Sequence, residues 1–166
     1  MKPRTLGLTP ELALALPSAA SSIAAPVTRA LNGDTIEILP DNHPLRIRLS
    51  GIDCPEEAQA FGTQAKKLTS DLCFGKVVTD DTRGTDRYGR TIGEVTLPDG
   101  RDLNHELVAA GLAWWYRKYA PDDRTLMELE SQARAAHRGL WSDPDPIAPW
   151  DWRHHTRSTP APAATH

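Results

Sequence analysis

Apolar and polar residues alternate in several short stretches before position 98. In residues 45–49, Leu45, Ile47 and Leu49 fall on one face, so Arg46 and Arg48 share the other. Such alternation is typical of strands with one buried face. Asn-Gly at positions 32–33 is a strong hairpin signal between two of these stretches. We therefore predict strands at residues 27–31, 35–39, 45–49, 76–81 and 91–97.

Helical spacing replaces this alternation in three other segments. The segment 55–73 carries a single apolar stripe, formed by Ala58, Phe61, Ala65, Leu68 and Leu72. Glu56 falls in the first turn of that predicted helix, where the helix dipole favours an acid. A short helix is predicted over 104–113, and a last one from Asp122 or Asp123 to Gly139. We expect Trp141 and Trp150 to fold back on the body.

The order of these elements predicts a fold class. Several short strands come early with one helix between them, and two helices come late. We predict an α+β protein, in which a five-stranded OB-fold β-barrel carries three α-helices packed on it. Residues 26–152 would form this domain. Residues 1–25 would be a leader, and residues 153–166 a disordered tail rich in proline and alanine.

Composition describes an ordinary soluble globule with no basic excess. The 166 residues are 39% hydrophobic and 25% charged, with a net charge of −3 and a pI near 6.0. A sequence-independent nucleic-acid binder usually has a basic balance, so any phosphate-binding field in this chain must be local. We expect a monomer with no membrane span, because no stretch after the leader approaches the ~18 apolar residues that a span requires.

The leader and the two cysteines bear on the compartment. Lys2 and Arg4 precede an apolar run and then small residues, which resembles a secretory signal, although Pro10 and Pro17 interrupt it. We expect export to the periplasm or medium; the alternative is a disordered leader. Cys54 and Cys73 permit one disulfide, but two free, partly buried thiols are the favoured interpretation.

The candidate chemistry lies in residues 32–35 and 46–56 and in the distant segment 86–90. From these segments we select three carboxylates and two guanidinium groups: Asp34, Asp53, Glu56, Arg48 and Arg90. Carboxylates can hold a hard cation and a water molecule, and arginines can hold a phosphate. Phosphodiester hydrolysis needs both, because charge on the phosphoryl oxygens must be stabilised while a base activates water.

Four of these residues also have a plain structural interpretation. Asp34 follows Asn-Gly and suits a turn, and Glu56 suits the first turn of a helix. Arg90 can pair with Asp86 in its own loop. Arg46 or Arg48 can be a mere surface charge, and the motif frame selects Arg48 as the functional one.

Four pieces of the chain together resemble the staphylococcal nuclease (thermonuclease) family. They are Asn-Gly-Asp-Thr at 32–35, Arg-Leu-Ser-Gly-Ile-Asp-Cys-Pro-Glu at 48–56, Asp-Arg-Tyr-Gly-Arg at 86–90, and the helix with Asn104, Leu107 and Val108 that ends in Gly-Leu-Ala. Each piece alone is weak, but their order and spacing together are specific.

The resemblance implies calcium-dependent endonuclease cleavage of DNA and RNA with little sequence preference. It implies that Asp34, Asp53 and the backbone carbonyl of Cys54 bind Ca²⁺. By the same resemblance Glu56 is the general base, and Arg48 and Arg90 contact the phosphate.

Substrate contacts outside this set are expected at Arg87, Tyr88, Arg117 and Tyr119. Tyr119 matches one nucleotide-packing tyrosine of the best-known relative, whereas Arg117 replaces the other; a guanidinium can still stack on a base. Packing for the tyrosines and solvation for the arginines are the alternatives. Residues 114–116, an aromatic run, are expected in the core. His154 and His155 are expected to be a flexible surface pair.

Two further functional interpretations stay open. The chain can be a catalytically weak nuclease-like module that binds nucleic acid or a protein partner. It can also be an OB-type protein with an unrelated ligand, in which the acidic cluster is structural. All five site residues are present in the sequence, which favours the nuclease.

Overall fold

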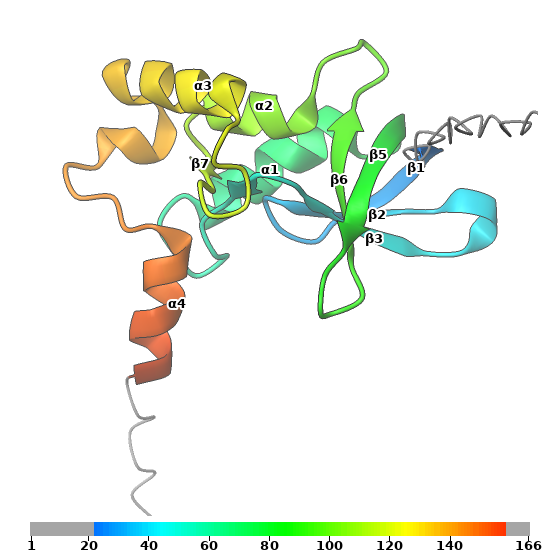
Figure 1. Cartoon of the computed structure of the whole chain (residues 1–166), viewed down its shortest axis with the longest axis horizontal. Coiled ribbons are helices and arrows are strands. Elements are labelled where there is room, and N and C mark those ends of the chain that lie inside the picture. The colour runs from blue at the N-terminus through cyan, green and yellow to red at the C-terminus, as the bar shows by residue number, and fades with distance from the viewer. Residues whose placement is uncertain (1–21, 159–166) are drawn as a thin grey trace, which may run out of the picture.

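The computed structural model describes residues 22–158, and its centre is a closed barrel of five strands (Figure 1). The strands run in the order β1-β2-β3-β6-β5, and β1 closes the barrel by pairing with β5. Four of the five pairings are antiparallel, while β3 and β6 run parallel. Their bounds are Ser22–Ala30 (β1), Thr35–Ile38 (β2), Leu45–Leu49 (β3), Val77–Thr85 (β5) and Thr91–Thr96 (β6).

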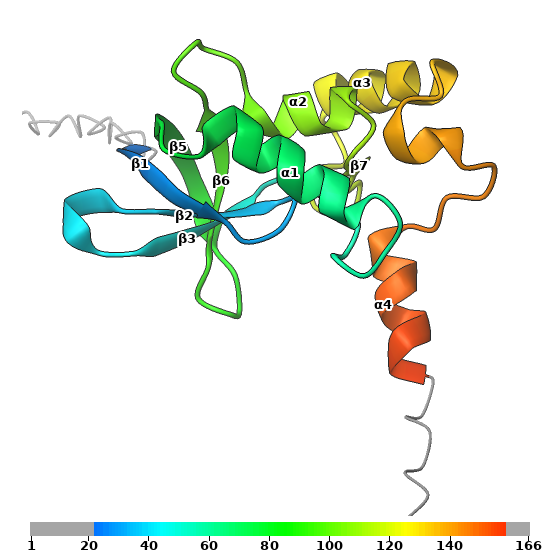
Figure 2. The same cartoon turned by 180° about the vertical axis from the view of Figure 1, so that it is seen from behind.

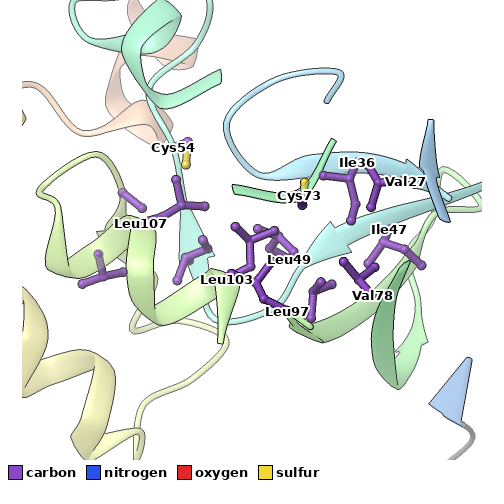
Figure 3. Packing of buried hydrophobic residues seen from close by; sticks show 14 of the residues in the cluster. Val27, Ile36, Ile47, Leu49, Cys54, Cys73, Val78, Leu97, Leu103 and Leu107 are labelled. Carbon is purple, nitrogen blue, oxygen red and sulfur yellow. The ribbon is translucent and has the colours of Figure 1, made fainter. Parts of the chain in front are cut away.

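The alternating pattern explains why the barrel closes around an apolar interior. In β3, Ile47 and Leu49 are fully buried, whereas the Arg46 side chain is 60% exposed. Figure 3 shows the inward side chains of the strands meeting those of the helices. The fully buried set includes Val27, Ile36, Ile38, Ile47, Leu49, Val78, Val95, Leu103 and Leu107. Removal of this apolar surface from water is the main stabilising contribution to the fold.

Helices cover one end of the barrel, and one more helix points away from it. α1 (Gly62–Cys73), α2 (Leu103–Ala109) and α3 (Arg124–Ala135) pack together, and α4 (Pro149–Ser158) extends from the body in both views (Figures 1 and 2). Short 3-10 turns lie at Pro40–Asn42 and Gly139–Ser142. A two-stranded sheet joins β4 (Ile52–Asp53) to β7 (Trp114–Trp115) and links the barrel to the helices.

The predicted fold class is confirmed, with three changes among the helices. The residues described contain four α-helices rather than three, because α4 was not foreseen. The helix expected to begin at residue 55 begins at Gly62, so its predicted start was wrong. The other two helices end earlier than expected, at Ala109 and Ala135.

The expected domain limits are crossed at both ends of the described segment. β1 begins at Ser22, within the proposed leader, and α4 runs across the boundary drawn after residue 152. Residues 1–21 and 159–166 lie outside the described residues, so the proposed export signal and the end of the tail stay predictions. Within residues 22–158 no helix is long and apolar enough to cross a membrane.

Aromatic residues tie the C-terminal part to the body. Trp141 is buried beside Trp114, with ring centroids 4.5 Å apart, and the Arg134 guanidinium lies 3.6 Å from the centre of the Trp141 ring. Trp150 stacks on Tyr116 at 5.0 Å. The expectation that Trp141 and Trp150 fold back is therefore confirmed. Trp114 and Trp115 form β7, and Trp115 belongs to the main core.

Both cysteines are buried, and both are free thiols. Cys54 and Cys73 are part of the main apolar core, where Figure 3 shows them among the aliphatic side chains. The favoured interpretation of two free thiols agrees with this arrangement.

Candidate active site

Asp34 sits at the end of the hairpin between β1 and β2, where α1 holds the turn. The hydroxyl of Thr69 donates to the Gly33 carbonyl at 2.6 Å. A Cβ on Gly33 would lie 2.7 Å from the Cys54 Cβ and 2.8 Å from the Ala65 Cβ, so only glycine fits. The Asp34 backbone N–H donates to the Asn32 side chain, as in an Asx turn.

The Asp34 carboxylate nevertheless faces inward and is almost fully buried. Its Oδ2 accepts the Cys54 backbone N–H at 2.8 Å and lies 3.1 Å from Arg48 Nη2. Its Oδ1 accepts the Thr35 hydroxyl. Asp34 is thus both a turn residue and a member of a polar cluster, so the structural interpretation does not compete with the functional one.

Arg48 is the hub of this cluster. Its Nη1 donates to the carbonyls of Leu49 and Ile52 at 2.7 and 2.9 Å, and its Nη2 donates to Asp53 Oδ1 at 2.9 Å. The Arg48 side chain is 15% exposed, against 60% for Arg46, which pairs with Glu37. The structure therefore places Arg48, the arginine that the motif selected, at the carboxylates and leaves Arg46 at the surface.

Asp53 comes from β4 and is the most buried of the three acids in this cluster. It lies opposite Trp114 in the small sheet, and its side chain is 2% exposed. The turn that leads into β4 is held by α2, because the Asn104 side chain donates to the Ser50 carbonyl at 2.9 Å. Burial raises the pKa of the Asp53 carboxyl, and the hydrogen bond from Arg153 opposes that shift.

Glu56 lies in a loop before α1, not in a helical turn. Its backbone N–H donates to the Gln59 side chain at 3.1 Å, and its carbonyl packs so close to Gly62 that a Cβ there would clash at 1.9 Å. The Glu56 side chain is 39% exposed. The loop therefore holds this carboxylate at the edge of the cluster, within reach of solvent.

A further arginine, missed in the sequence, completes the cluster. Arg153 of α4 donates through Nη2 to Asp53 Oδ2 and through Nη1 to Glu56 Oε1, both at 2.7 Å. A weaker contact joins Nη1 to Asp53 Oδ1 at 3.3 Å. Arg153 stands 97 and 100 positions after its partners, so no local spacing could reveal the contact. The neighbouring Trp150, expected to pack on the body, was the only signal available.

Burial and charge shape the ionisation of this cluster. Although burial disfavours its charged form, the pKa of Arg48 is raised by Asp34 and Asp53. Burial also raises the pKa of the Cys54 thiol well above its usual value, so this thiol stays neutral. Three carboxylates then face two guanidinium groups, which leaves an acidic excess at the cluster.

The donor chemistry of Asp34 and Asp53 fits a hard cation such as Ca²⁺. Both carboxylates contact the same Arg48 nitrogen, at 3.1 and 2.9 Å, so their oxygens lie close together, and Cys54 follows Asp53 directly in the chain. Carboxylate and carbonyl oxygens are the ligands that Ca²⁺ prefers. Among residues 22–158, however, no group of three or more acidic, histidine or cysteine side chains is already arranged around a metal position.

The other predicted site residues make contacts in their own surroundings. Arg90 donates to Asp86 at 2.7 Å, in the turn between β5 and β6. Arg87 donates to the hydroxyl of Tyr88, which is 66% exposed. The turn leads into β6, which pairs in parallel with β3, the strand that carries Arg48, with Thr91 opposite Ile47. The structure therefore places Arg90 beside that strand, with Asp86 as its ion-pair partner and not a carboxylate of the cluster.

The second predicted pair, Arg117 and Tyr119, follows β7. Arg117 lies over the Trp115 ring and 3.4 Å from Glu130, and Tyr119 is 68% exposed with its ring against Tyr116. The segment after β7 therefore presents exposed aromatic and cationic groups. His154 and His155 are exposed on α4, and the His155 ring contacts the Asp151 carbonyl.

Comparison with known proteins gives consistent matches. Residues 46–143 match the family model described as staphylococcal nuclease homologue. An uncharacterized endonuclease of Escherichia coli O157:H7 is 44% identical over 138 residues, which cover 83% of this chain and 90% of the relative. The micrococcal nuclease of Shigella flexneri is 43% identical over 136 residues, covering 76% and 78%. The staphylococcal-like nuclease CAN1 of Arabidopsis thaliana is 37% identical over 113 residues, covering 68% and 34%.

Proposed function

Because the chain belongs to the staphylococcal nuclease homologue family and is a nuclease of the hydrolase class, we propose that it is a calcium-dependent endonuclease. It would cleave phosphodiester bonds of DNA and RNA with little sequence preference. The observation that carries this proposal is the buried cluster in which Arg48 binds Asp34 and Asp53, with Glu56 at its edge. Residues from separate segments of the chain thus meet in one polar cluster, which supports the proposal.

The two aspartates and the Cys54 carbonyl are the proposed calcium ligands. Hard oxygen donors suit Ca²⁺, and the bound ion would neutralise charge that develops on the phosphoryl oxygens. The chain contributes the rigidity: Cys54's own N–H fixes Asp34, and Arg48 fixes Asp53. Donors held in place before the reaction need no reorganisation during it.

Glu56 is the proposed general base. A base must lie within hydrogen-bond reach of the attacking water, and the partly exposed Glu56 carboxylate is accessible to one. Gln59 holds the Glu56 backbone, which limits where the carboxylate can point. The proton taken from water would reside on this carboxylate.

Arg48 and Arg90 are the proposed phosphate ligands. A planar guanidinium donates two parallel hydrogen bonds to a phosphate, and it stays charged at any working pH. Arg48 lies at the carboxylates, whereas Arg90 lies in the turn before β6, where it binds Asp86. Arg87, Tyr88, Arg117 and Tyr119 are proposed to contact nucleotides beyond the cleaved bond.

A nuclease assay with a matched pair of variants tests this function. Cleavage of single-stranded DNA should require calcium and stop on addition of a chelator. Glu56→Gln should lower kcat by roughly 10²-fold or more, because the amide cannot accept the proton. Glu57→Gln is the control, since the neighbouring Glu57 is exposed and pairs only with Lys66 among the ion pairs of the described residues. Cleavage that is independent of calcium, or unaffected by Glu56→Gln, would reject the proposal.

One observation favours the alternative of a module that binds without cutting. Arg153 binds Oε1 of Glu56, an oxygen of the carboxylate that is proposed to act on water. If this contact were permanent, the protein would bind nucleic acid without turnover. The same assay separates the two functions, because binding of DNA with no calcium-dependent product would support the module that binds without cutting.

A further inference from the structure

The start of α4 is anchored on the body beside the acidic cluster. Trp150 stacks on Tyr116 with the rings 11° from parallel, and it meets the edge of Trp114 at 5.6 Å. Just before the helix, Ala148 is buried, and Gln59 donates to the Ile147 carbonyl at 2.6 Å. The remainder of α4 extends away from the barrel and the other helices (Figures 1 and 2). The first turn of α4 is therefore held by the aromatic contacts of Trp150, which we call the aromatic anchor, while the rest of the helix projects from the body.

Arg153 uses that anchor to reach the cluster. Residues three apart share one side of a helix, so Arg153 lies on the same side as Trp150. Its guanidinium bridges Asp53 and Glu56 with two hydrogen bonds of 2.7 Å. The Arg153 side chain is 34% exposed, so solvent reaches this contact from one side. The bridge joins one proposed metal ligand to the proposed base.

The charges show what this bridge does. Asp34, Asp53 and Glu56 carry three negative charges, and Arg48 supplies one positive charge. An excess of two negative charges suits a divalent cation. Arg153 halves that excess by placing a second guanidinium on two of the three carboxylates. A cation on the same oxygens opposes a metal ion both by charge and by occupying its ligand.

We propose that α4 is an internal competitor for the metal site, in which Arg153 occupies Asp53 and Glu56 and is displaced when Ca²⁺ binds. The inference rests on the proposed calcium-dependent function and deepens it by assigning a regulatory contact to that site. Displacement frees the Glu56 oxygen for water in the same event that brings the metal. By thermodynamic linkage, calcium weakens the docking of α4 by the same factor by which docked α4 weakens calcium binding.

Calorimetric titration of calcium into the full chain tests the competition without relying on activity. Arg153→Gln should bind Ca²⁺ about tenfold more tightly than the wild type, because a coupling of this kind is usually 5- to 150-fold. Arg153→Lys keeps the charge but lacks the two-pronged contact, so its affinity should fall between the two. Arg29→Gln is the matched control: it removes one positive charge from an exposed arginine that pairs with Glu37, and should leave calcium affinity unchanged.

The outcomes separate this inference from the function on which it rests. Equal affinity in Arg153→Gln and wild type would overturn the competition while leaving the calcium proposal intact. Weaker affinity in Arg153→Gln would also overturn it, and would show that Arg153 positions Asp53 for the metal. Absence of calcium binding in every variant would overturn both proposals.

Hydrogen exchange of the same proteins supplies a second, independent readout. Saturating calcium should accelerate amide exchange in residues 149–156 of the wild type, because the helix loses its contact with the cluster. Arg153→Gln should show the faster exchange already without calcium. Trp150→Ala removes the anchor and should likewise raise calcium affinity. Slower exchange of α4 in the wild type on calcium addition would contradict displacement. This result does not depend on whether the variants fold.

Discussion

At the scale of single residues, Arg48 decides the geometry of the site. Its two terminal nitrogens bind two backbone carbonyls and two aspartates. These four acceptors come from the residue before β2, the last residue of β3 and both residues of β4. Lysine carries the same charge, but it has one nitrogen and no planar fork. Arg48 therefore holds the carboxylates in place, in addition to the phosphate-binding role proposed for it.

Replacement of Arg48 by lysine should consequently lower activity strongly, although lysine carries the same charge. We expect Arg48→Lys to lose roughly 10²-fold or more in kcat/KM, since both phosphate binding and carboxylate placement suffer. Steady-state cleavage of single-stranded DNA measures this effect. Arg46→Lys, on the same strand with its side chain 60% exposed, should remain close to wild type. Near-wild-type activity of Arg48→Lys would exclude its assigned role.

Among the helices, the N-terminus of α3 could be predicted from the sequence, whereas that of α1 could not. α3 begins where a cap was expected: Asp123 accepts the Leu126 backbone N–H at 2.9 Å. α1 does not, because residue Phe61 adopts a left-handed conformation just before Gly62 and no side chain caps the helix. The loop 55–61 is instead held by Gln59, which binds the Glu56 backbone and the Ile147 carbonyl.

The cap of α3 leads to a stability prediction. Asp123→Ala should destabilise the protein by about 1 kcal/mol, because one N–H at the start of the helix loses its acceptor. Urea unfolding followed by circular dichroism measures the change. Asp122→Ala serves as the control, because Asp122 is the exposed neighbour and α3 begins with Asp123 as its cap. A larger loss in Asp122→Ala than in Asp123→Ala would move the cap to the other aspartate.

At the scale of the whole molecule, one core buries both cysteines and joins the barrel to the helices. The Cys54 backbone binds Asp34 at the site, and Cys73 is the last residue of α1. Both side chains belong to the main core. Burial raises the pKa of Cys73 to about 11, and Lys76 only partly opposes that shift. Burial likewise raises the pKa of Cys54. Both thiols are therefore protonated and shielded while the fold is intact.

Thiol labelling reports on this core directly. At pH 8, below both thiol pKa values, a thiol reagent should leave the native protein unlabelled, since the thiolate is the reactive form. In urea without a reductant, both cysteines should react as the core opens. The absorbance of the released chromophore measures both states. A denatured protein that reacts only after reduction would instead carry a Cys54–Cys73 disulfide.

Features that depend on neighbouring residues were predicted correctly from the sequence, whereas features that depend on distant contacts were not. Alternation in residues 45–49 correctly separated buried Ile47 and Leu49 from exposed Arg46, because strand geometry alone sets that pattern. The stripe of Ala58 and Phe61 overextended α1, because contacts of Gln59 with Ile147 outweighed the helical pattern there. The roles of the five motif residues stay predictions that the assays above test.

Strand alternation and turn chemistry act over a few residues, so the strands of the barrel and the turn at Gly33 could be predicted from the amino-acid order. The three carboxylates and their arginines could be picked out in the same way. Folding in three dimensions was needed to bring Arg48 to Asp34 and Asp53, and Arg153 to Asp53 and Glu56. That last contact depends on where α4 docks through Trp150. A contact between positions 100 residues apart requires the packing of the whole chain, and no local pattern encodes it.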